Sequence, residues 1–258
     1  MKKKILPFAL GLLLGAVCCI LAGPKLVGIY RDVSFYWTER SETELKIKSY
    51  AEEKGISYGA YPRQLIELLE RNPETEEFVL NYPFREESRF FLTEEEKSGG
   101  VPLFLQWDER WGYETYGSGC IGITGCGPTC LAMAGYYVTG EERFNPAAMA
   151  EFSWKNGYYE MGQGSSWTLI SEGGVKLGLD VTEIPLVKKR IVDNLKVGNP
   201  IILAMGPGDF TATGHYIVLV GMEDGCFRVN DPNSRKNSEK LWTYEELESQ
   251  IRNIWVIR

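Results

Sequence analysis

The stretch Gly125–Met133, which reads GCGPTCLAM, constrains this 258-residue chain more than any other part of it. Two glycines flank Cys126, and Pro128 follows where a helix can begin, because the first helical turn does not need the N–H that proline lacks. The apolar residues beyond it predict a buried helix that ends at Gly140. A helix N-terminus favours the thiolate, which is the reactive form of cysteine. We therefore interpret Cys126 as a nucleophile.

A cysteine nucleophile needs a base, and the chain contains a single histidine, His215. A lone histidine is most often an ordinary core or surface residue. This one, however, follows a glycine and precedes a β-branched and aromatic run that predicts a buried strand. Histidine changes its charge near neutral pH, so it can take the thiol proton and later give it to a leaving group. Any Cys–His enzyme built from this chain must use His215.

A third residue should orient the imidazole, and two candidates follow the next predicted strand. Asp224-Gly225 predicts a turn, and Cys226–Asn230 predicts a returning strand that leads to Asp231. Side chains alternate between the two faces of a strand. A two-residue loop alone places Asn230 on the face of the histidine, whereas an odd loop or a bulge places Asp231 there. Both alternatives stay open on these grounds.

Four motifs together resemble a known family. They are Gln106, Gly125–Thr129, Gly214–Leu219 and Asn230–Pro232. In this order they resemble the double-glycine, bacteriocin-processing cysteine peptidases, and more closely the stand-alone relatives of these enzymes in Gram-positive bacteria, which have the papain-like fold. The resemblance extends over roughly residues 101–258.

The resemblance implies a role for each of four residues. Cys126 corresponds to the nucleophile, His215 to the base, Asp231 to the orienting residue and Gln106 to an oxyanion-hole donor. In the transporter-linked members the glutamine lies only a few residues before the cysteine, whereas here Trp107–Gly125 intervene.

Composition excludes several other classes. The net charge of −7 argues against a nucleic-acid partner, because no basic stripe would neutralise phosphates. A single histidine excludes zinc-protease motifs with paired histidines, and the cysteine spacing does not fit a structural zinc site. We expect no metal and no cofactor. Outside the cell, Cys120 could pair with Cys226 or Cys130, although the pattern favours neither bridge.

The N-terminus predicts a membrane segment. Three lysines precede the uncharged run Ile5–Gly23, whose 19 residues would reach about 28 Å as a helix, close to the hydrocarbon thickness of a bilayer. The lysines place the N-terminus in the cytoplasm and the rest of the chain outside. Residues 1–23 are therefore expected to be a transmembrane anchor, with a cleaved signal peptide or lipidation at Cys18 or Cys19 as alternatives.

Residues 24–100 predict short amphipathic helices, either a spacer or a helical cap on the enzyme. The charged run before Gly99-Gly100 marks the expected domain boundary. A paired glycine also raises the idea of autoprocessing, but a flexible linker explains it better.

Residues 101–258 predict an α+β, papain-like domain. Val101–Gln106 alternates like a strand, helices follow, and an antiparallel sheet comes last, with Asn253–Ile257 as its closing edge strand. The cleft between the helical and sheet halves is the natural site. Gly164 and Trp167 are candidates for substrate contact.

These observations predict a membrane-anchored extracellular cysteine peptidase that cleaves peptide bonds through an acyl-enzyme thioester. Its partner would be a peptide or protein substrate, cell-wall peptide included. One alternative is a cell-wall amidase or transpeptidase with the same triad, and another is a non-catalytic binding module that retains the fold.

Overall fold

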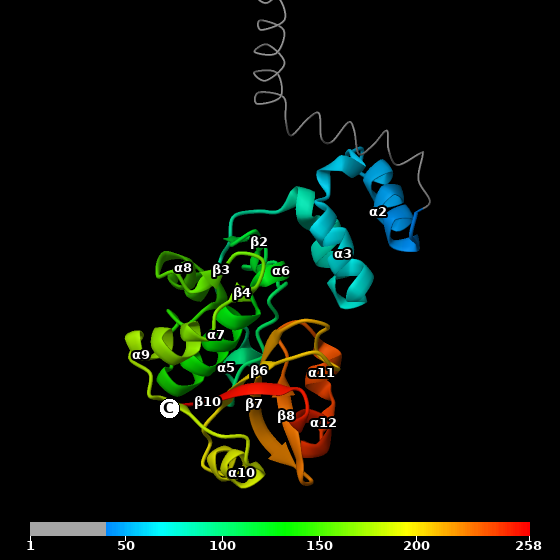
Figure 1. The fold of residues 1–258 in the computed structure, drawn as a ribbon. Coiled ribbons are helices and arrows are strands. Elements are labelled where there is room, and N and C mark those ends of the chain that lie inside the picture. Colours follow the sequence, from blue (N-terminus) through cyan, green and yellow to red (C-terminus); the bar gives the residue numbers. More distant parts are fainter. Residues whose placement is uncertain (1–39) are drawn as a thin grey trace, which may run out of the picture. The chain divides into compact units, whose positions relative to one another are not determined.

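The computed structural model describes residues 40–258 (Figure 1), so the expected anchor in residues 1–23 lies outside the described part of the chain. Within residues 40–258, no helix combines the length and the apolar character that a membrane crossing requires. Contacts between residues divide the chain into two units, one ending at Pro83 and one beginning at Phe84.

The first unit is a small group of helices. It contains α2 (Glu42–Glu53), α3 (Arg63–Arg71) and α4 (Glu76–Asn81), with 3₁₀ turns at Tyr58–Ala60, Pro73–Thr75 and Tyr82–Phe84. Ser41 begins α2 with a capping box, in which its side chain accepts from the backbone of Glu44 and the Glu44 carboxylate accepts from the backbone of Ser41. The apolar face of α3 is buried, as the helical spacing of its leucines predicts.

An extended arm, residues 84–100, opens the second unit, ahead of the boundary expected at Gly100. It contains one helical turn, α5 (Glu94–Lys97), which Thr93 caps. The helical half follows with α6 (Ile121–Thr124), α7 (Cys126–Thr139), α8 (Pro146–Lys155), a π-helical turn at Leu169–Gly173 and α9 (Gly174–Lys176). Two short hairpins join it, β1 (Thr115–Tyr116) with β2 (Gly119–Cys120), and β3 (Tyr159–Glu160) with β4 (Gly164–Ser165).

The sheet half is a six-stranded antiparallel sheet in the order β5-β10-β6-β7-β8-β9. Its strands are β5 (Val181–Glu183), β6 (Ile201–Met205), β7 (His215–Glu223), β8 (Cys226–Asn230), β9 (Leu241–Trp242) and β10 (Ile251–Ile257). Three helices accompany it, α10 (Lys188–Lys196), α11 (Arg235–Glu239) and α12 (Tyr244–Glu248). Helices that precede an antiparallel sheet make the α+β class that the sequence predicts.

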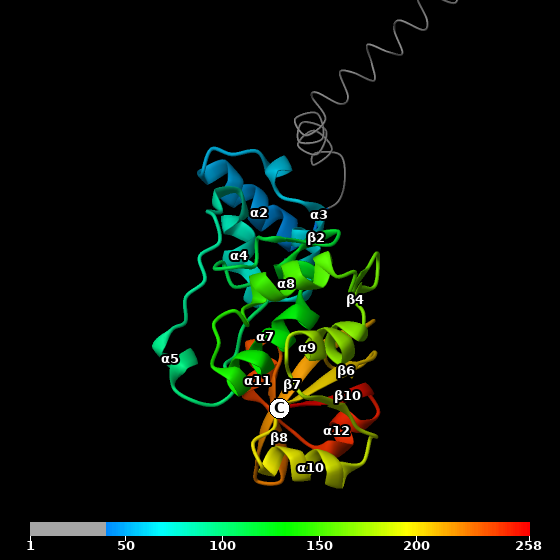
Figure 2. The same ribbon diagram turned by 90° about the vertical axis from the view of Figure 1, so that its left-hand side faces the viewer.

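Two apolar cores cover the two faces of this sheet. Ile202, Val218 and Trp255 pack with the buried side of α7. The residues between them in the strands, such as Ile201 and Leu203, point to the opposite face and pack with α10 and α12. Figures 1 and 2 show α7 on one side of the strands and α10 on the other.

Two expectations from the sequence are wrong. Val101–Gln106 forms no strand. The backbone N–H of Gln106 hydrogen-bonds a loop instead of a neighbouring strand, because it donates to the carbonyl of Pro232. The last strand, β10, is not an edge strand, because it lies between β5 and β6. Its run of four buried residues, Ile254–Ile257, is typical of an interior strand with both faces covered.

Candidate active site

Cys126 is the first residue of α7, as the sequence predicts. Its N–H and that of Gly127 precede the first intrahelical bond, which Thr129 N–H makes to Gly125 O, so both point free of the helix ladder. Gly127 is needed for packing: a Cβ there would lie 2.7 Å from the Cβ of Ser165. A side chain at this position would therefore push the Ser165 loop away from the helix start.

His215 is the first residue of β7 and pairs with Met205, the last residue of β6. The imidazole is buried, and its Nε2 lies 2.7 Å from Oδ1 of Asp231. The side chain of Cys126 lies near the ring and raises the pKa of His215. Because Nε2 faces Asp231, Nδ1 is the nitrogen left for the thiol. The helix start and the strand start thus bring the candidate nucleophile and the candidate base into contact.

A bulge decides that Asp231 rather than Asn230 faces the histidine. The hairpin between β7 and β8 has a two-residue loop, Asp224-Gly225, and both residues have positive φ, as a type I′ turn requires. This loop alone would place Asn230 on the histidine face. The register shifts between Leu219 and Gly221, however, so every later residue of β8 moves to the other face.

The side chains of both residues at the end of β8 are held by hydrogen bonds. The Asp231 carboxylate is 1% exposed and also accepts from the backbone of Asn233 and the side-chain amide of Asn237. Asn230 turns away and donates to the carbonyls of Val101 and Pro102. These bonds orient Asp231 toward the imidazole. Asn230 instead holds the segment Val101-Pro102 against the end of β8.

The electrostatics favour a charged imidazole. Burial lowers the pKa of His215, but the Asp231 carboxylate, and after it Cys126, outweigh burial and raise the pKa to about 10. At neutral pH the ring is then imidazolium, flanked by a carboxylate on one side and a sulfur on the other.

Gln106 lies close to this group but not in the cleft. It is 3% exposed, and its Nε2 donates to Gly122 O at 3.0 Å, just before the start of α7. Its backbone N–H donates to Pro232 O at 2.7 Å, next to Asp231. One hydrogen of Nε2 remains beyond the bond to Gly122. These two hydrogen bonds tie Gln106 to the helical half and to the sheet half.

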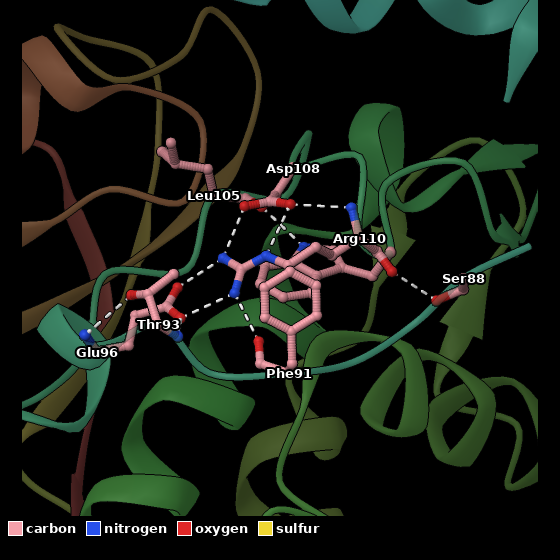
Figure 3. A network of polar contacts seen from close by, with 8 residues as sticks. Ser88, Phe91, Thr93, Glu96, Leu105, Asp108 and Arg110 are labelled. Carbon is pink, nitrogen blue, oxygen red and sulfur yellow. Dashed lines mark hydrogen bonds and ion pairs between the residues drawn. The ribbon is translucent and has the colours of Figure 1, made fainter. Parts of the chain in front are cut away.

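Arg110 fixes the loop that carries Gln106 (Figure 3). Its guanidinium donates to both carboxylate oxygens of Asp108 and of Glu96, and to the carbonyl of Phe91. Burial alone would raise the pKa of Glu96, but Arg110 and Thr93 lower it. The bonds to Asp108 and Glu96 join the Gln106 loop to the arm.

A cleft of about 700 Å³ opens beside Cys126 and His215. The loop Gly162–Thr168 forms part of its wall, and the end of β6 with Gly206 and Pro207 forms another part. The candidate substrate contacts Gly164 and Trp167 both line it, and Trp167 is half exposed. Cys126 is thus accessible from a cleft large enough for a stretch of peptide.

The other cysteines of the described chain are free thiols. Neither candidate bridge of Cys120 forms, with Cys226 or with Cys130. Burial raises the pKa of the Cys120 thiol to about 11 and that of Cys130 well above its ordinary value. These two buried thiols are therefore poor nucleophiles.

Sequence reasoning missed several cleft residues. Ser165 contacts Gly127 and hydrogen-bonds the Tyr116 hydroxyl, and Tyr216 donates to its carbonyl. Arg252 and Glu160 are the charged residues of the wall. A serine within a glycine-rich loop was the available signal for Ser165, but no local pattern marks the two charged residues.

A comparison with models of protein families identifies one family. Residues 99–258 match the model of the Peptidase_C39-like family. No curated protein matches the chain.

Solved structures also match. The peptidase domain of Streptococcus ComA, described as a bi-functional ABC transporter involved in a quorum-sensing pathway, is 22% identical, with a TM-score of 0.40 over 52% of this chain and 89% of that one. A putative C39-like peptidase from Bacillus anthracis is 15% identical, with a TM-score of 0.38 over 61% of this chain and 94% of that one. The peptidase domain of Streptococcus mutans ComA is 19% identical, with a TM-score of 0.34 over 42% and 88%.

Proposed function

The chain belongs to the Peptidase_C39-like family, and on this premise we propose that it is a cysteine peptidase with Cys126 as its nucleophile. The observation that carries the proposal is the placement of His215, which hydrogen-bonds Asp231 and lies beside Cys126 at the edge of an open cleft. A binding module that only retained the fold would have no need of this buried ion pair, so the arrangement favours an enzyme.

In the reactive form the thiol proton of Cys126 has already passed to His215, so a thiolate lies beside an imidazolium. The thiolate attacks the carbonyl carbon of the scissile peptide bond. The oxyanion that forms accepts from the N–H of Cys126. Gln106 would be a second donor if its Nε2 turned toward the cleft when substrate is bound. Asp231 keeps the ring oriented and charged.

The imidazolium then gives its proton to the leaving amine, and the C–N bond breaks to leave an acyl-thioester on Cys126. Water, with its proton taken by His215, attacks the thioester. The peptide acid leaves and the thiol is restored.

The place of action is also a proposal. The lysine-led apolar run at residues 1–23 supports a single-pass anchor with the peptidase domain outside the cell, or a secreted enzyme if the run is cleaved. Its substrates would then be extracellular peptides or proteins, including the peptides of the cell wall.

The test is hydrolysis by the full chain and by Cys126→Ala on a peptide library and on purified peptidoglycan, with products identified by mass spectrometry. Cys226→Ala, which removes a partly exposed thiol in strand β8, is the matched control. Wild type and Cys226→Ala should release the same fragments, and Cys126→Ala should release none. Cleavage by Cys126→Ala at the wild-type rate would refute the mechanism. Products from peptidoglycan alone would favour the cell-wall amidase.

A further inference from the structure

One charged side chain of the cleft is placed by an irregularity in the sheet. Ile251 pairs with Met205 and Asn253 pairs with Ala204, so Arg252 is the extra residue of a bulge in β10. Bulges occur next to active sites, where they redirect a side chain that regular alternation would point elsewhere. Arg252 is exposed and lines the same cleft as Cys126.

The neighbouring glycine leaves room for the guanidinium. A Cβ on Gly206 would lie 2.4 Å from Nε of Arg252 and 2.7 Å from its Nη2, so any other residue would displace the arginine. Gly206 directly follows Met205, which pairs with His215 across the sheet. Arg252 therefore lies at the same end of the sheet as the catalytic base, with one strand between them.

Part of the guanidinium already has protein acceptors. Arg252 lines the Cys126 cleft and also a second cavity beside Ile184 and Ile254. Nη1 donates to Ser249 O at 2.9 Å and to Ile251 O at 3.2 Å. Nε and Nη2 form the edge over Gly206, and among residues 40–258 no carboxylate forms an ion pair with Arg252. Arg110 and Arg258 do have carboxylate partners. Glu160, the acid in the cleft wall, makes no ion pair with Arg252.

We propose that Arg252 is a specificity-determining residue, which binds a carboxylate of the peptide substrate through Nε and Nη2. The proposal rests on the peptidase function proposed above and names its substrate class, peptides with a negative charge near the cleaved bond. A guanidinium presents two parallel N–H groups at the spacing of a carboxylate, which makes the contact selective as well as attractive. The carboxylate is either an Asp or Glu side chain or the C-terminus of a short peptide.

The experiment compares matched peptides built on the sequence that wild type cleaves best in the library. At each position around the cut, one peptide carries Glu and its partner carries Gln, and each is made with a free and with an amidated C-terminus. The full chain, Arg252→Gln, Arg252→Glu and a control, Arg190→Gln on exposed α10, are assayed for kcat and KM.

Wild type should cleave the Glu peptide at one position at least tenfold faster in kcat/KM than the Gln peptide, with the difference in KM. Arg252→Gln should bring this ratio close to one, Arg252→Glu should reverse it in favour of the Gln peptide, and Arg190→Gln should keep the wild-type ratio. If the C-terminus is the source, amidation should produce the loss and the internal Glu should have no effect.

Equal losses on all peptides in Arg252→Gln, or no charge preference in wild type, would overturn the proposal and leave the peptidase function standing. If wild type cleaves no peptide, the peptidase function fails, and calorimetric binding of Glu and Gln peptide pairs from the library to Cys126→Ala tests Arg252. Weaker binding of acidic peptides after adding Arg252→Gln supports the carboxylate site, and unchanged binding overturns it.

Discussion

The charge of His215 can be measured directly, because the chain has a single histidine and an untagged protein gives one set of imidazole signals. The perturbation is Asp231→Asn, which keeps the shape of the side chain and removes its charge. The 1% exposure of Asp231 leaves little solvent to screen the loss. An NMR titration of the ring in wild type and in the variant then reports the pKa without further assignment.

The size of the effect follows from the site. The pKa of His215 is raised from its ordinary 6.5 to about 10. Each pKa unit corresponds to about 1.4 kcal/mol. The interactions that favour the imidazolium therefore exceed its burial penalty by on the order of 5 kcal/mol. A close opposite charge accounts for about 1 to 3 pKa units, so Asp231→Asn should lower the pKa of His215 by about 1 to 3 units. Asp209→Asn, whose carboxylate bonds Gln250 instead, should leave it unchanged.

The same shift makes stability depend on pH. The folded-state pKa of His215 lies above its unfolded value, so the stabilisation is complete below about pH 6.5 and is lost as pH rises through about 10. Urea unfolding should show the largest gap between wild type and Asp231→Asn at pH 6 and a smaller one at pH 10. A ring that titrates at the same pH in both proteins, or a gap that does not change with pH, would refute the reasoning.

Three further outcomes are expected. Arg110→Ala should lower the free energy of unfolding by about 3 kcal/mol in urea titrations, because it leaves two part-buried carboxylates without their cation; a change below 0.5 kcal/mol would contradict this. Gly135→Ala should lower the free energy of unfolding by about 1 to 3 kcal/mol, because the new Cβ would lie 2.2 Å from the ring of Phe144. Gly221→Ala is the control and should be close to neutral, because its Cβ would have no atom within 4 Å. Cys130 is fully buried in α7, so it should resist iodoacetamide in the native protein and react only in urea. Peptide mapping of the alkylated protein measures this, and labelling of native Cys130 as fast as an exposed thiol would contradict its burial.

The sequence alone determined where the chemistry-bearing residues lie within their own elements. Pro128 and the glycines specify the start of α7 at Cys126, and the β-branched run specifies a strand that begins at His215. These assignments depend on backbone preferences within a few residues, so no distant contact was needed to predict them. The local pattern did not decide between Asn230 and Asp231 as the residue that orients the imidazole. The resemblance to known peptidases implied Asp231.

Only the tertiary structure decided what depends on pairing between distant strands. A bulge after Leu219 turns Asp231 rather than Asn230 toward the imidazole, and a second bulge directs Arg252 into the cleft. A bulge inserts one residue and inverts the facing of those beyond it, yet no single residue type announces it. The interior position of β10 likewise arises from partners about 50 and 70 residues away in the chain, which local periodicity does not encode.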